Sequence, residues 1–162
     1  MTTEPKIEER AAQPYVAIRR RVTMQAIGEI ADRIPELFGW LGAHGIAPAG
    51  APFLKYNAFA ADGEMEIEAG VPVLTPIEPD GEVLAGTLPA GRYATVTYIG
   101  HPDGLLKRTT ELLDWAKAEQ LTWDVTNDRW ACRLEIYETD PTREPDLTKW
   151  ETELAFKLAD HS

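Results

Sequence analysis

The 162-residue sequence contains little of what marks disulfide-bonded, metal-binding, membrane or secreted proteins. Its one cysteine, Cys132, excludes an intramolecular disulfide and leaves too few ligands for a cysteine-based zinc cluster. It has no run of 18 apolar residues, which excludes a transmembrane helix. Residues 1–10 are charged and polar, unlike a signal peptide, so we expect a cytoplasmic protein.

Positive charge is also scarce in this chain. Lys and Arg number 16 against 27 Asp and Glu, which gives a formal net charge of −11. A chain with this charge repels a phosphate backbone, and it contains no basic amphipathic segment that would bind a membrane surface. We therefore expect neither nucleic acid nor a membrane as a partner, and the oligomeric state stays open.

The common catalytic signatures are missing as well. There is no Gly-x-Ser-x-Gly elbow, Walker phosphate loop, dinucleotide glycine fingerprint or His-Glu-x-x-His motif. The three histidines lie far apart in sequence, so we predict no metal site, and no motif indicates a cofactor. Cys132 alternates with Leu134 and Ile136, which favours a small buried hydrophobic residue over a nucleophile.

The sequence does contain a repeated pattern, because the order strand, helix, strand, strand is predicted twice along the chain. Apolar residues at steps of three and four predict both helices, and Pro35 predicts either a kink in the first helix or its first turn. The predicted elements of the first half are a strand at 15–18, a helix at 27–41 and strands at 52–60 and 65–69. After a turn-rich linker at 75–81, those of the second half are strands at 83–88 and 92–99, a helix from 105, and strands at 131–137 and 149–158.

This repeated order predicts an α+β protein with a mostly antiparallel sheet and two helices on one face. We expect a single domain over residues 1–162, made of two fused βαββ modules of the SHS2 type at about 12–75 and 83–160 and related by pseudo-two-fold symmetry. Residues 1–12 are expected to be a polar lead-in. Two such modules leave a groove between their helices, and grooves at module junctions are common ligand sites.

One strand of the second half has a polar face that carries Arg133, Glu135 and Tyr137. Glu135 either forms a salt bridge, with Arg133 or Lys55, or is the polar floor of a cavity. A buried carboxylate among aromatic rings attracts a lipophilic cation through charge and cation–π contacts. With a raised pKa it would instead exchange protons near neutral pH.

Aromatic residues are the other resource of the chain. Tyr56 lies at the position that matches Tyr137 in the first half, and a buried tyrosine needs a partner for its hydroxyl, so both are expected to edge a cavity. Trp40 and Trp115, on the two helices, are expected to pack in the core. The acidic run at 64–68 indicates the exposed face of a strand rather than a metal site.

From about Tyr15 to Leu158 the chain resembles the GyrI-like small-molecule-binding family, which includes the effector-binding domains of multidrug-responsive transcription regulators. Three segments carry the resemblance: a Glu-x-Tyr strand with its Asp-Pro turn at 133–141, a closing strand at 150–154, and a second-module start at 88–94 with the later Gly100. The resemblance implies two fused modules around a ligand groove.

In family members, a glutamate at the position of Glu135 contacts cationic drugs in an aromatic pocket. The resemblance therefore implies that Glu135 binds the ligand, with Tyr137, Tyr56 and Trp150 as candidate walls. Because no helix-turn-helix segment flanks the domain, we expect a stand-alone binder rather than a whole regulator.

Three functions fit this reading, and we favour binding, with hydrolysis as the alternative. The first is a module that binds lipophilic, often cationic, aromatic compounds. The second is a hydrolase that opens cyclopropane-bearing natural products, as some proteins similar to this family do, with Glu135 activating water and Tyr137 polarising the leaving carbonyl. The third, ranked last, is a gyrase-interacting inhibitor protein.

Overall fold

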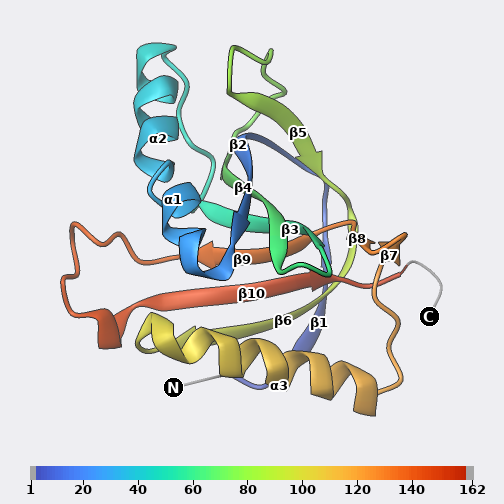
Figure 1. The fold of residues 1–162 in the computed structure, drawn as a ribbon. Helices are drawn as coiled ribbons and strands as arrows, with labels where there is room; N and C mark the ends of the chain where they lie inside the picture. The colour runs from blue at the N-terminus through green and yellow to red at the C-terminus, as the bar shows by residue number, and fades with distance from the viewer. Residues whose placement is uncertain (1–2, 160–162) are drawn as a thin grey trace.

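The computed structural model describes residues 3–159, which form a curled antiparallel sheet with helices beside it (Figure 1). The strands of the sheet run in the spatial order β1-β6-β10-β9-β3-β4-β2-β5, and two short strands, β7 and β8, branch from β3. In chain order they are β1 (Lys6–Arg10), β2 (Gln13–Thr23), β3 (Phe53–Phe59), β4 (Glu64–Pro72), β5 (Leu84–Leu88), β6 (Gly91–Ile99), β7 (Val125–Thr126), β8 (Arg129–Trp130), β9 (Arg133–Tyr137) and β10 (Glu151–Lys157).

The two halves of the chain meet at the centre of this sheet. The first half contributes the neighbours β3-β4-β2 and the second half β6-β10-β9, so the antiparallel pair β9 and β3 joins them. This is the arrangement that two fused strand-helix-strand-strand units produce. The predicted α+β class with its antiparallel sheet is confirmed, while the predicted module boundaries stay a prediction. Residues 1–2 and 160–162 of the predicted domain lie outside the described residues.

The first half carries α1 (Ile27–Ala31) and α2 (Ile34–Ala43), and the second half carries α3 (Leu105–Ala118). The single predicted helix is divided just before Pro35, which occupies the first turn of α2, where its missing N–H costs no helical hydrogen bond. Short 3-10 turns, Met24–Ala26 and Pro102–Gly104, lead into α1 and α3, and a third covers Leu147–Lys149 before β10. No described helix is long and apolar enough to cross a membrane.

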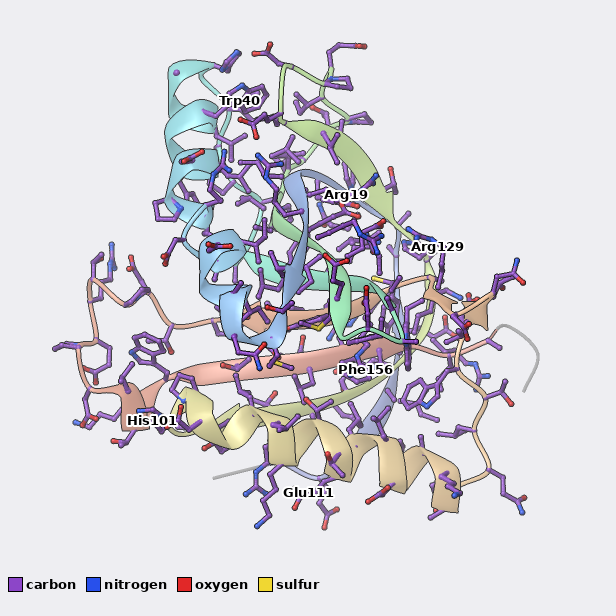
Figure 2. All side chains as sticks on the ribbon, viewed as in Figure 1. Arg19, Trp40, His101, Glu111, Arg129 and Phe156 are labelled. Carbon is purple, nitrogen blue, oxygen red and sulfur yellow. The ribbon has the colours of Figure 1, made fainter. Side chains whose placement is uncertain are left out.

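Both faces of the curled sheet are covered. Helices α1 and α2 pack on a cluster that includes Leu37, Leu54 and Ile67, and α3 packs through Leu112 on Leu154. On the opposite face, the curl of the sheet brings Tyr93 and other buried residues together in a second cluster. Cys132 lies fully buried in this cluster, as expected. In Figure 2, Glu111 points from α3 away from the sheet, while Trp40 on α2 points toward the chain before β5.

Trp40 and Trp115 are only partly buried beside these clusters, and the Trp40 indole donates a 3.2 Å hydrogen bond to Asp80. The two tryptophans therefore pack against the core from its edge rather than within it.

The structure corrects the expected polar lead-in. Residues 6–10 form the edge strand β1, which pairs with β6 in antiparallel register. The apolar–polar alternation that marks a strand is missing from its sequence, because charged residues occupy both of its faces. Ion pairs hold it in place: the Arg10 guanidinium lies 2.9 Å from Glu8 and 2.7 Å from Glu153 of β10.

The acidic run at 64–68 is the second correction. Glu68 is only 2% exposed, because the curl of the sheet covers the face on which it lies. Its carboxylate accepts hydrogen bonds from the hydroxyl of Tyr15 and the amide of Asn57, each at 2.6 Å, and lies 3.5 Å from the Lys55 ammonium. An expected solvated carboxylate is therefore part of a buried polar network.

Candidate functional site

A cavity of about 380 Å³ opens between the turn that leads into α1 and the start of α3. Strands β3, β9 and β10 supply its floor. Its size falls within the range of small-molecule sites. Apart from two charged floor residues and Asp103 at the rim, aromatic and aliphatic side chains dominate its lining, which comprises Met24, Ile27, Ala31, Leu54, Tyr56, Phe59, Pro102, Asp103, Leu105, Leu106, Thr109, Arg133, Glu135, Tyr137, Trp150, Thr152 and Phe156.

Glu135 lies on the central strand of this floor. Its neighbours across the sheet are Leu54 on β3 and Leu154 on β10, so its side chain rises between two apolar residues on the face that the helices cover. One carboxylate oxygen accepts a hydrogen bond from the Tyr137 hydroxyl at 2.5 Å and a longer one from the Tyr56 hydroxyl at 3.3 Å. The cavity floor is therefore a carboxylate held by two phenols.

Burial raises the pKa of Glu135 above its usual value, although the hydrogen bonds from Tyr137 and Tyr56 and the nearby Arg133 act in the opposite direction. Burial and the neighbouring carboxylate also raise the pKa of both tyrosine hydroxyls, so these keep their protons at neutral pH and act as donors. The site thus holds one carboxyl group whose ionisation is penalised by its partial removal from solvent.

Of the two readings left open for Glu135, the structure favours the cavity floor. Among the described residues, no basic side chain lies within ion-pair distance of its carboxylate. Lys55 points to the opposite face of the sheet, where its ammonium bonds Asn57 at 2.5 Å and lies near Glu68.

Trp150 lies at the entrance to β10 and forms part of the cavity wall. Its indole N–H donates a 2.7 Å hydrogen bond to the carbonyl of Glu144, which fixes the ring against the loop before it. The structure therefore brings Glu135, Tyr137, Tyr56 and Trp150 to one cavity, and their role in binding stays a prediction.

Sequence reasoning missed several residues of this cavity. Met24, Phe59 and Leu106 lie at its lining and are 53%, 38% and 69% exposed, which gives the mouth an apolar rim. Arg133 also lines it; the sequence placed this residue on the polar face of its strand but gave it no role beyond a salt bridge. Its alternation with Glu135 along β9 was the one available signal that it shares the cavity floor.

The chain is similar to known proteins over most of its length. A family model described as GyrI-like small molecule binding domain matches residues 3–159, nearly the whole chain. No curated protein matches the sequence.

Solved structures share the fold at low sequence identity. The crystal structure of the EcmrR C-terminal domain is 19% identical, with 97% of this chain and 98% of that chain covered and a TM-score of 0.78. In the EcmrR–DNA complex, at 18% identity and a TM-score of 0.80, 97% of this chain covers only 57% of that chain. The chain thus spans little more than half of that DNA-bound protein.

Two further structures share the fold. SAV2435 bound to tetraphenylphosphonium is 16% identical, with 97% of this chain and 94% of that chain covered and a TM-score of 0.69. A hydrolase from Listeria innocua is 11% identical, with 96% and 92% covered and a TM-score of 0.58. At these identities the likeness establishes a common fold.

Proposed function

Because the chain belongs to the GyrI-like small-molecule-binding domain family, we propose that its cavity binds lipophilic aromatic cations, with Glu135 as the acidic floor. The observation that carries this proposal is a partly buried carboxylate in the cavity, without an ion-pair partner among the described residues and surrounded by aromatic side chains. Such a group is costly to ionise in the empty cavity, and a cation placed over it removes that cost.

The lining supports the same class of ligand. Tyr56, Tyr137 and Trp150 offer ring faces or edges to a flat or bulky aromatic body, and a cation beside them gains attraction from their π systems. SAV2435, whose structure was solved bound to tetraphenylphosphonium, has a similar fold, and this supports the choice of a cationic ligand.

Titration of the chain with rhodamine 123, a lipophilic cationic dye, tests the proposal by fluorescence anisotropy. We expect saturable binding with a dissociation constant in the micromolar range, which corresponds to a binding free energy of about −8 kcal/mol. Absence of saturable binding of this dye would contradict the proposal.

The affinity for this dye is expected to depend on pH. The raised pKa of Glu135 means that acidification protonates the carboxyl group and removes its charge, so the dye binds more weakly as the pH falls and more tightly as it rises through that pKa. The dissociation constant, measured from about pH 5 to about pH 8, should fall as the pH rises and then reach a plateau. The variant Glu135→Gln should give a flat profile, and a wild-type profile equally flat would disagree with the role of this carboxyl group.

The apolar rim gives another expected result. In Leu106→Asn, a neutral polar side chain replaces an exposed apolar one at the mouth of the cavity, so we expect dye binding to weaken about fivefold, or ~1 kcal/mol. Stability to urea should change by less than about 0.5 kcal/mol, because the residue is exposed. The matched control is Leu74→Asn, at a 78% exposed leucine outside the cavity. Equal binding by both variants would show that Leu106 does not contact the dye.

A second candidate function is hydrolysis of cyclopropane-bearing compounds, favoured by the raised pKa of Glu135 and by the two phenols that contact it. Glu135 would accept a proton from water as the water oxygen attacks a ring carbon. The breaking C–C bond would deliver its electrons to a conjugated carbonyl oxygen, which Tyr137 would polarise. The enolate carbon would then take the proton from Glu135, which completes the addition of one water. Mass spectrometry of the recovered compound distinguishes the two functions: an unchanged mass supports binding, and the addition of one water supports hydrolysis. Hydrolysis by Glu135→Gln at the wild-type rate would exclude this mechanism.

A further inference from the structure

Arg133 is a second charged group on the cavity floor, and the function proposed above makes no use of it. It precedes Glu135 by two residues on β9, so both side chains rise from the same face of the strand. Two residues along a strand span roughly 7 Å. The cavity therefore presents a carboxylate and a guanidinium side by side, a short distance apart.

Three aromatic rings hold the guanidinium in position. Its central carbon lies 4.6 Å from the ring centre of Phe59 and 4.7 Å from those of Trp130 and Phe156. These rings come from β3, β8 and β10, so three strands fix one side chain. Stacking of this kind stabilises the cation but satisfies none of its N–H donors.

Those donors have no protein partner. Among the described residues, no carboxylate lies within ion-pair distance of the Arg133 guanidinium, and no oxygen accepts a hydrogen bond from it. Burial lowers its pKa to about 10, so the group still carries its charge at neutral pH. The guanidinium is partly exposed in the cavity, so a ligand can reach its donors, and a planar guanidinium matches a carboxylate with two parallel hydrogen bonds.

We propose that the cavity selects aromatic zwitterions, with the cationic centre of the ligand over Glu135 and its carboxylate on the donors of Arg133. The inference rests on the proposed binding function and narrows its ligand class. A purely cationic ligand meets attraction from one floor residue and repulsion from the other. A zwitterion whose cationic centre lies at Glu135 and whose carboxylate lies at Arg133 is attracted by both residues.

A matched pair of dyes tests the proposal. Rhodamine 110 and rhodamine 123 share one aromatic cation, and they differ because the first has a free carboxylate where the second has a methyl ester. We expect wild-type protein to bind rhodamine 110 at least about tenfold more tightly, or ~1.4 kcal/mol. In Arg133→Met, which keeps an apolar side chain against the three rings and loses the charge, the two affinities should agree within about twofold.

Two further variants separate the possible causes. Arg143→Met removes the same charge from an exposed loop and should keep the wild-type preference. Glu135→Gln should weaken both dyes equally, because both carry the cation.

If wild-type protein binds both dyes equally, or the ester more tightly, while Glu135→Gln weakens them, the binding function stands and the inference about Arg133 is wrong. Failure of wild-type protein to bind either dye overturns both. The comparison in wild-type protein is decisive even if Arg133→Met does not fold.

Discussion

Glu135→Gln is expected to weaken binding of rhodamine 123 by about tenfold or more at neutral pH, a loss of ~1.4 kcal/mol. The substitution keeps the shape of the side chain and its capacity to accept a hydrogen bond from Tyr137, and it removes the negative charge over which the cation lies. Attraction between two charges 4 Å apart is about 4 kcal/mol at an effective dielectric constant of 20, and removal of the carboxylate from solvent offsets part of it. Fluorescence anisotropy titration of the two proteins in parallel measures the difference.

The matched control for this variant is Glu138→Gln. Glu138 is exposed just beyond the end of β9, outside the cavity, and its substitution changes the net charge of the protein by the same amount. Wild-type affinity in this control excludes a general effect of net charge. An unchanged affinity in Glu135→Gln would instead return Glu135 to a structural role.

Lys55→Met is expected to destabilise the protein by about 3 kcal/mol at neutral pH, with little effect on dye binding. Lys55 and Glu68 are 9% and 2% exposed, and the substitution leaves a buried carboxylate with neutral donors and the half-exposed Arg19 as its remaining partners. Unfolding in urea followed by circular dichroism gives the free energy. Lys107→Met, at an exposed lysine on α3, is the control and should change it by less than about 0.5 kcal/mol.

The pH dependence of stability supplies a second test of this network. Burial acts to raise the pKa of Glu68, but Lys55, Tyr15 and Asn57 outweigh it and hold the pKa below its usual value. A lowered folded-state pKa stabilises the protein above the unfolded pKa of glutamate, and this contribution is lost as the pH falls. The destabilisation by Lys55→Met should therefore shrink on acidification.

The double variant Lys55→Met/Glu68→Gln should recover at least half of the stability that Lys55→Met loses. No recovery would mean that the charge pair is not the cause of that loss.

Much of this fold follows from local patterns in the sequence. Steps of three and four predict the helices, alternation predicts the long strands, and the repeated order predicts an antiparallel sheet built from two related halves. Strand β1 could not be predicted because both of its faces are charged and backbone pairing with β6 defines it. The burial of Glu68 could not be predicted because it depends on the curl of the whole sheet, which covers a face that alternation alone assigns to solvent.

The residues of the candidate site that could be predicted are those with a local signal in the sequence. Alternation along one strand places Glu135 and Tyr137 on one face, and the matching position in the other half adds Tyr56. Trp150 came from the family resemblance alone. The setting of Arg133 could not be predicted, because its three rings lie on strands far apart in the sequence and meet only in the folded sheet. The ranking of a gyrase-interacting function stays a prediction.

The measurement that most directly tests the binding account is a crystal structure of the protein with rhodamine 123. We expect the dye in the cavity between the first turn before α1 and the start of α3, with its xanthylium ring against Tyr56 and Trp150 and its cationic edge within about 4 Å of the Glu135 carboxylate. Dye bound elsewhere on the protein, with the cavity empty and Glu135 still held by its two tyrosines, would contradict the account.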